Sequence, residues 1–196
     1  MTQFDTLFDD PPLTPAGERL LTAAAELFYR RGIRAVGVDL VAEAAGTTKK
    51  TLYDRFGSKD ELVALYLRRR ARRWQEFLAA RLDGTSGRDR VLAVFDALAV
   101  WLRDQDRGCA FVNAYAEVGG TGHPAEVVIR TEKDWMHRLF VRLVDEAGLS
   151  GDVLGPPVHL LYEGATVAHT AGGWPDAVGV ARSAAASLLG NVPATA

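Results

Sequence analysis

Hydrophobic residues recur along this chain every three or four positions, which is the period of an amphipathic α-helix. The pattern begins after Thr14-Pro15, where a hydroxyl cap precedes a proline at the first helical position, and it stops at Gly32. The apolar positions of this first run are Leu20, Leu21, Ala24, Leu27 and Phe28. No strand-like alternation and no internal repeat stand out, so the sequence predicts an all-α protein.

Two short helices and a long one follow. A helix from about Val38 to Ala45 ends at Gly46, which can take the left-handed conformation, and a third helix, capped by Thr47 or Thr48, runs to about Phe56. A capping box at 58–61 opens a fourth helix that ends at 83–84. Its roughly 25 residues span about 37 Å, enough to link two modules rigidly.

Further helices are expected at about 88–106, 109–118, 123–147, 157–171 and 176–190. Glycine and proline clusters mark the breaks between them, and Gly155-Pro156-Pro157 is one such break.

The segment GTTKKTLYDRFGSKDEL, residues 46–62, is basic and rich in hydroxyl groups. Two short helices joined by a tight glycine turn are the pattern of a helix-turn-helix unit, whose last helix lies in the major groove of DNA. Leu52 and Phe56 anchor its inner face, which leaves Lys50, Thr51 and Asp54 pointing outward. Asp54 either accepts from a cytosine amino group or holds Lys50 or Arg55 in place. A merely solvated basic helix would not account for the spacing, the turn glycine and the hydroxyl cluster together.

The segment GIRAVGVDLVAEAAGTTKKTLYDRFGSKDELVALYL, residues 32–67, closely resembles the DNA-binding signature of TetR-type (TetR/AcrR) transcriptional regulators. More loosely, RGCAFVNAYAEVGGTGHP, residues 107–124, resembles the core domain of one branch of that family. The resemblance implies an all-helical homodimer. It places a helix-turn-helix DNA-binding domain at 14–58, a ligand-binding and dimerisation domain at 59–196 that begins with the long fourth helix, and a flexible arm at 1–13.

Site residues follow from the resemblance position by position. It implies base or adjacent backbone contacts for Lys49, Lys50 and Tyr53, and phosphate contacts for Thr48, Thr51, Arg55 and Lys59. Gly37 departs from the family pattern, because many members have a hydroxyl there that caps the second helix and binds phosphate. Backbone N–H groups can still approach a phosphate at this helix N-terminus, but the operator sequence cannot be transferred from relatives.

Charge is unevenly distributed along a chain whose net charge is -2. Residues 14–83 carry 14 Lys and Arg against 9 Asp and Glu, whereas residues 84–196 carry 9 against 13. This asymmetry suggests that the two parts of the chain have different functions. Five arginines lie in the run 68–73. We interpret the run as a solvated helix face whose long stems cover apolar neighbours; the alternatives are added affinity for the DNA backbone and a nuclear-import signal.

Aromatic residues are concentrated in the middle helices, where they form a plain core or line an apolar cavity. The resemblance implies a cavity enclosed by the fourth to the eighth helices, and the candidate ligand-binding residues are Trp74, Phe77, Phe111, Tyr115, Trp135, Met136 and Tyr162. The last two helices, about 157–190, are rich in small residues. We expect them to form a four-helix bundle across the two-fold axis of a homodimer, with packing inside the monomer as the alternative.

Catalytic, metal and cofactor motifs are missing from the sequence. The four histidines lack metal-ligand spacing, and no nucleophile elbow, zinc-protease motif or dinucleotide fingerprint occurs. Cys109 follows a glycine near a helix start, where the alternatives are a redox-sensing thiolate and a small buried residue. No apolar run approaches the roughly 20 residues of a membrane helix, and the N-terminus has no secretory pattern. We expect a cytoplasmic protein that is not an enzyme and has no metal or cofactor.

The sequence therefore predicts a ligand-responsive, sequence-specific DNA-binding transcriptional regulator. Its partners would be double-stranded DNA with a near-palindromic operator, a small apolar or aromatic effector that releases it as a repressor, and a second copy of the chain. The alternative is an all-helical small-molecule-binding protein or enzyme that uses the C-terminal core pocket without regulating DNA.

Overall fold

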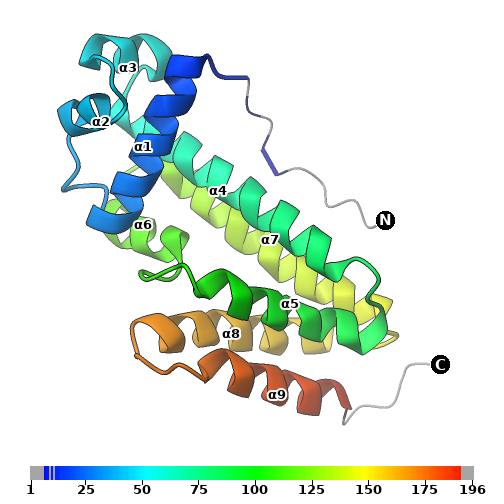
Figure 1. The fold of residues 1–196 in the computed structure, drawn as a ribbon. Helices are drawn as coiled ribbons and strands as arrows, with labels where there is room; N and C mark the ends of the chain where they lie inside the picture. The colour runs from blue at the N-terminus through cyan, green and yellow to red at the C-terminus, as the bar shows by residue number, and fades with distance from the viewer. Residues whose placement is uncertain (1–6, 9, 11, 191–196) are drawn as a thin grey trace. The chain divides into compact units, whose positions relative to one another are not determined.

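A computed structural model describes residues 7, 8, 10 and 12–190 of the chain (Figure 1). All regular structure in this range is α-helical and no strand occurs in it, which confirms the predicted fold class. The flexible arm predicted for residues 1–13 lies mostly outside the described residues.

The described residues divide into two compact units. The N-terminal unit comprises residues 7–73 and 110–132, and the C-terminal unit comprises residues 74–109 and 133–190. Two long helices, α4 (Lys59–Leu82) and α7 (Ala125–Glu146), contribute residues to both units. The boundary predicted after residue 58, between a DNA-binding and a ligand-binding domain, stays a prediction. The two units are defined by packing, which places α6 (Ala110–Val118) and the start of α7 in the N-terminal unit.

The N-terminal unit is built on the first three helices, α1 (Pro15–Arg31), α2 (Val38–Ala44) and α3 (Lys49–Phe56), together with α6 (Ala110–Val118). Its core contains side chains that are at most 3% exposed, among them Leu20, Ala24, Phe28, Leu52 and Leu62. Burying one such leucine contributes about 1.5–3 kcal/mol relative to leaving it in water. The apolar face read from the sequence is therefore the face that packs.

Side-chain caps fix the helix starts in this unit. The hydroxyl of Thr48 accepts from the backbone N–H of Thr51 at 3.2 Å, and that of Ser58 accepts from the N–H of Glu61 at 3.0 Å. Gly46 ends α2 with a φ of 60°, the left-handed conformation expected of it. Of the two threonines proposed as the cap of α3, Thr48 is the one used.

The C-terminal unit contains α5 (Gly87–Leu102), α8 (Gly151–Thr170), α9 (Ala177–Gly190) and the C-terminal parts of α4 and α7. Helix α9 packs against α8 and α5 (Figure 1). The centre of the C-terminal unit is formed by side chains that are each no more than 1% exposed: Phe95, Met136, Leu139, Phe140 and Leu143.

The break predicted at Gly155-Pro156-Pro157 is wrong, because α8 starts at Gly151 and both prolines lie inside it. A Cβ on Gly151 would lie 2.3 Å from the carbonyl oxygen of Val141, and one on Gly155 would lie 2.7 Å from the Cα of Val141. The two glycines, four residues apart, thus let α8 pack closely on α7. This packing outweighs the local cost of proline in a helix.

The interpretation of the arginine run as a solvated face is also wrong for most of its members. Arg68 and Arg72 both pair with Asp10, whose side chain is 3% exposed, and Arg69 binds both carboxylate oxygens of Glu18 at 3.0 and 3.2 Å. Hydrogen bonding to Arg69 holds the pKa of Glu18 below its ordinary value. The run ties α4 to α1 and to the segment before it.

Candidate nucleic-acid interface

Helix α3 buries one residue and leaves most of the others in water. Leu52 is fully buried, whereas the exposed side chains on or next to α3 include those of Thr48, Lys49, Lys50, Tyr53 and Arg55. Thr51 is half-buried. Tyr53 is 43% exposed, so its side chain is accessible to a partner. Six of the seven predicted DNA-binding residues therefore lie on or beside one short helix.

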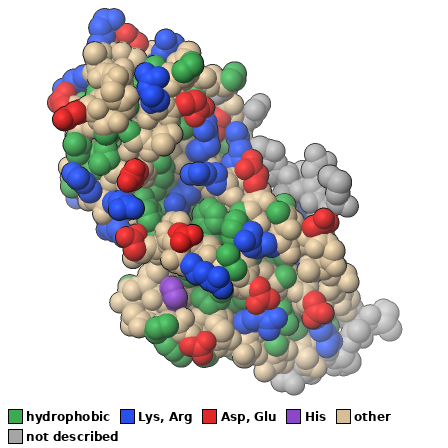
Figure 2. All heavy atoms as spheres, viewed as in Figure 1, with side chains coloured by type: hydrophobic (Ala, Val, Ile, Leu, Met, Phe, Trp, Pro, Cys, Tyr) green, Lys and Arg blue, Asp and Glu red, His purple; other side chains and the backbone are tan. Residues whose placement is uncertain are grey.

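Both lysines of α3 are paired with carboxylates. The ammonium of Lys50 lies 2.9 Å from Asp54, and that of Lys49 lies 3.2 Å from Asp39 of α2. Asp54 therefore contacts Lys50 in this structure, and its alternative role as an acceptor from a cytosine amino group stays a prediction. Such exposed pairs contribute little to stability, so a phosphate or a base edge can replace the carboxylate. Figure 2 shows basic and acidic side chains interspersed over this part of the molecule.

The turn between α2 and α3 is fixed by one hydrogen bond within the motif and one from α1. The backbone N–H of Thr47 donates to the carbonyl of Ala42 at 2.9 Å, and the side chain of Arg19, on α1, donates to the carbonyl of Ala45 at 3.3 Å. Helix α1 therefore holds the end of α2, and through the turn it sets the angle at which α3 is presented.

The start of α2 has no side-chain cap, as expected from Gly37. This glycine has φ -80° and ψ 158°, a conformation open to any residue, and a Cβ on it would meet no atom within 4 Å. Position 37 therefore has room for a side chain, although the residue there is glycine.

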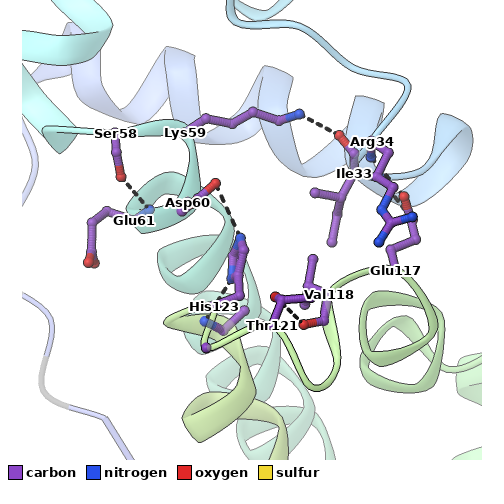
Figure 3. Close-up of polar contacts among 12 residues, drawn as sticks. Ile33, Arg34, Ser58, Lys59, Asp60, Glu61, Glu117, Val118, Thr121 and His123 are labelled. Atoms are coloured by element: carbon purple, nitrogen blue, oxygen red, sulfur yellow. Dashed lines mark hydrogen bonds and ion pairs between the residues drawn. The ribbon is translucent and has the colours of Figure 1, made fainter.

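Lys59, the seventh predicted DNA-binding residue, lies apart from the others. Its ammonium donates to the carbonyl of Ile33, in the turn between α1 and α2 (Figure 3). It also lies 5.9 Å from the ring centroid of Phe28. In this structure the lysine supports that turn. Its predicted phosphate contact stays a prediction.

Two polar contacts between the α6–α7 region and the first helices were missed by the sequence analysis. The carboxylate of Glu117, on α6, accepts from the backbone N–H groups of Ile33 and Arg34 at 2.9 and 2.7 Å. Nε2 of His123 lies 3.3 Å from Asp60 at the start of α4 (Figure 3). Glu117 and Ile33 are 84 positions apart, so no local pattern could have linked them.

The turn between α6 and α7 has its own carboxylate. Glu126 accepts from the backbone N–H groups of Thr121, Gly122 and His123 at 2.9, 2.8 and 3.2 Å. Burial would raise the pKa of Glu126, but these N–H groups and that of Gly120 hold it below its ordinary value. The turn that carries His123 is therefore internally fixed.

The predicted ligand-binding residues fall in both units. Trp74 contacts three of the others: its ring centroid lies 5.8 Å from that of Phe77 and 6.4 Å from that of Tyr162, and its Nε1 donates to the sulfur of Met136 at 3.3 Å. Trp135 is buried in the same unit. The remaining two, Phe111 and Tyr115, belong to the N-terminal unit, and Tyr115 is 46% exposed. The aromatic cluster also contains Phe95, Trp101 and Phe140, which were not among the candidates.

A half-buried polar group lies in the C-terminal unit. The ammonium of Lys133 contacts both carboxylate oxygens of Glu163, at 2.9 and 3.0 Å, and the sulfur of Cys109 at 3.5 Å. His159 lies 3.4 Å from the same carboxylate. Burial would raise the pKa of Glu163, but His159 and Lys133 hold it below its ordinary value. Within the described ranges, no three His, Cys, Asp or Glu side chains are grouped to hold a metal ion.

Comparison with known proteins identifies the family to which the chain belongs. The model for bacterial regulatory proteins of the tetR family matches residues 20–66, which include α2 and α3. A crystal structure from Streptomyces avermitilis, assigned to the TetR transcriptional regulators, is 32% identical over 90% of this chain and 97% of that chain, with a TM-score of 0.78. This chain belongs to the TetR family. A TetR-family transcriptional regulator from Streptomyces coelicolor has a TM-score of 0.82 at 29% identity over 90% of this chain and 95% of that chain.

Two curated relatives come from Mycolicibacterium smegmatis. The HTH-type transcriptional activator FasR is 32% identical over 122 residues, which are 60% of this chain and 56% of FasR. The HTH-type transcriptional repressor KstR2 is 41% identical over 61 residues, 30% of each chain. The TetR-family chain described here thus spans about half the length, or less, of the curated relatives it matches.

In this TetR-family chain, α8 and α9 leave an apolar face uncovered. Val153, Leu160 and Val167 of α8 are 67%, 71% and 50% exposed, and their seven-residue spacing places them on one side of the helix. Beside them an open groove of about 580 Å³ is lined by Pro157, Leu160, Leu161, Ala184, Ser187 and Leu188. None of the described helices is long and apolar enough to span a membrane.

Proposed function

We propose that this TetR-family chain is a sequence-specific DNA-binding transcriptional regulator that reads the major groove with α3. The observation that carries the proposal is the exposed face of α3, where Lys49, Lys50 and Tyr53 surround one buried anchor, Leu52. Lysine donates to guanine edges or to phosphates, and the tyrosine hydroxyl fixes register on the backbone. Thr48, Thr51 and Arg55 flank this face and supply phosphate contacts. A protein with this role acts on DNA, so we place it in the cytoplasm.

The uncovered face of α8 and α9 supports a homodimer. Three large apolar side chains on one side of α8 are each at least half exposed, and the adjoining groove is apolar. A second copy would bury this face in a four-helix bundle across a two-fold axis. Two α3 helices related by that axis would bind half-sites about one DNA turn apart, which requires a near-palindromic operator.

We place the effector site in the aromatic cluster of the C-terminal unit. Trp74, Phe77, Met136 and Tyr162 meet there, and Trp135 is buried in the same unit. Lys133 and Glu163 supply a polar pair in the same unit. These residues suit a small apolar or aromatic molecule with one polar group. A coupling of about 1–3 kcal/mol would change operator affinity roughly 5- to 150-fold.

Repression released by the effector is the proposed sign of control. KstR2 is named a repressor and FasR an activator. A reporter gene controlled by the operator tests whether the protein represses or activates transcription. Repression requires expression to fall when the protein is supplied. Expression that rises would make the protein an activator.

Selection of bound duplexes from a random DNA pool tests the proposal as a whole. We expect the full chain to recover a near-palindrome and the Lys50→Ala/Tyr53→Ala variant to recover none. If the wild type recovers no motif at low salt, the regulator proposal is wrong, and the aromatic cluster becomes the place to look for a ligand or substrate.

A further inference from the structure

The turn between α1 and α2 forms a receptor for one carboxylate. Gly32 ends α1 with a φ of 89°, a left-handed conformation that favours glycine. The next two backbone N–H groups, those of Ile33 and Arg34, then point the same way and donate to the two oxygens of Glu117 at 2.9 and 2.7 Å. Consecutive N–H groups that converge in this way form an anion-binding concavity.

The fit between this receptor and Glu117 is close. A Cβ on Gly32 would lie 3.0 Å from Oε1 of Glu117 and 3.3 Å from Oε2, so any side chain there would press on the carboxylate. Gly32 is therefore required twice, once for its backbone conformation and once for the space that the carboxylate occupies. Charge-assisted hydrogen bonds of this kind are stronger than those between neutral groups.

Lys59 binds the same turn with the opposite charge. Its ammonium donates to the carbonyl of Ile33, so both polar groups of this one residue have charged partners. Figure 3 shows Lys59 and Glu117 approaching the turn from α4 and α6. The conformation of the turn thus depends on two helices outside the helix-turn-helix motif.

The turn leads directly to the start of α2. Gly37 provides no side-chain cap there, so local capping does not fix the first residues of α2. Helix α2 in turn bears Asp39, which pairs with Lys49 of α3. The path from Glu117 to the exposed face of α3 therefore passes through one turn and one short helix, all within the N-terminal unit.

We propose that Glu117 is a positioning residue for DNA binding, through which α6 sets the α1–α2 turn and the start of α2. This inference rests on the proposed function. The carboxylate of Glu117 is the contact by which α6 reaches this turn. A purely structural role would lower the free energy of unfolding and leave the affinity of the folded protein for its operator unchanged.

The test compares two variants that each remove one negative charge. Glu117→Gln keeps the side chain's shape but turns an amide N–H₂ toward one of the two backbone donors. Glu26→Gln, on α1, is the matched control, because Glu26 is 68% exposed and pairs only loosely with Arg30, at 3.8 Å. Operator affinity of the full chain would be measured by fluorescence anisotropy at fixed salt, well below the unfolding midpoint of each variant. The operator is the duplex recovered by wild-type selection.

The sign of the change decides the outcome. Removing a negative charge from a DNA-binding protein favours association, so Glu26→Gln should bind as tightly as the wild type or slightly more tightly. Glu117→Gln should bind about 10-fold more weakly, within the range of allosteric couplings, and select the same motif. Binding by Glu117→Gln that equals that of Glu26→Gln would overturn the inference. Failure of the wild type to select any motif would overturn the proposed function and this inference with it.

Hydrogen exchange of the wild type keeps the inference testable if Glu117→Gln does not fold. The amides of Ile33 and Arg34 lie in a turn, outside regular helical hydrogen bonding, yet we expect both to be protected by the carboxylate. Exchange of both amides at the rate of open peptide groups would overturn the proposed grip of Glu117 on the turn.

Discussion

Charged pairs are arranged differently in the two units of this protein. On α3 the side chains of Lys50 and Asp54 are 85% and 57% exposed, whereas in the C-terminal unit those of Lys133 and Glu163 are 27% and 24% exposed. An exposed pair is weak and is easily exchanged for another partner. A half-buried pair is screened less, and losing one member leaves a charge without compensation. The difference suggests that the pairs on α3 are replaced on DNA, while the inner pair helps to hold the fold.

The two units also differ in what surrounds an exposed apolar side chain, and dimerisation is the property that we expect to change most. Leu160 of α8 and Val127 of α7 are 71% and 69% exposed, but only Leu160 borders the apolar groove. We expect Leu160→Asp to weaken dimerisation about 100-fold, because a charge would be buried at the interface without a partner. Val127→Asp, in the N-terminal unit, should leave it unchanged. Sedimentation equilibrium measures both, and equal effects would contradict the proposed interface.

The two lysines give the next effect. Lys133→Met leaves Glu163 half-buried with a weaker set of partners, and we expect the free energy of unfolding to fall by about 2 kcal/mol, reduced from the value for a fully buried pair by its partial exposure. Lys50→Met should change it by less than about 0.5 kcal/mol. Urea unfolding of both variants measures the difference. Equal losses would remove the distinction between the inner and the outer pair.

Gly37 allows the DNA-binding side to be strengthened. Gly37→Ser fits without a clash, and its hydroxyl can cap α2 or donate to a phosphate. We expect operator affinity to rise about threefold, a gain consistent with a capping contribution of a few tenths of a kcal/mol over glycine and one added phosphate contact. Gly190→Ser, at the end of α9, is the control, because a Cβ there also meets no atom within 4 Å. An unchanged affinity would show that α2 does not approach the backbone at this point.

Acidification should weaken the contribution of the Lys133–Glu163 pair to stability, and this is the smallest change that we expect. The pKa of Glu163 is lower in the folded protein than its ordinary value of 4.5, so its ionised form stabilises the fold above that pH. This contribution is lost as pH falls through the lowered folded pKa. We expect the urea midpoint of the wild type to drop on acidification below about pH 4.5, and Glu163→Gln to flatten that dependence. A steeper dependence in Glu163→Gln would contradict the assignment.

Local signals account for what the sequence predicted well. Gly46, the cap at Thr48 and the cap at Ser58 each act within four residues, and they fixed α2, α3 and the start of α4. The exposed face of α3 followed because one buried position, Leu52, determines which side chains point outward. In this part of the chain the secondary structure, the turn and the exposed chemistry agree.

Contacts between distant residues account for the errors. Arg69 binds Glu18, which lies 51 positions away, so the sequence around the arginines does not show that they are paired. Gly155 contacts α7 instead of ending a helix, so α8 begins earlier than the glycine and prolines predict. The contact of Glu117 with Ile33 likewise joins residues 84 positions apart. Partners of this kind are set by packing, which periodicity and capping rules do not specify.

Sequence reading by α3 can be measured directly, through the preference of the protein for one duplex over another. The most direct measurement compares the wild type with Lys50→Ala/Tyr53→Ala on the selected duplex and on a scrambled duplex, at several salt concentrations. We expect the wild type to prefer the selected duplex and to bind more weakly as salt rises, and the double variant to lose the preference while remaining folded. A double variant that discriminates between the duplexes as well as the wild type would contradict sequence reading by α3.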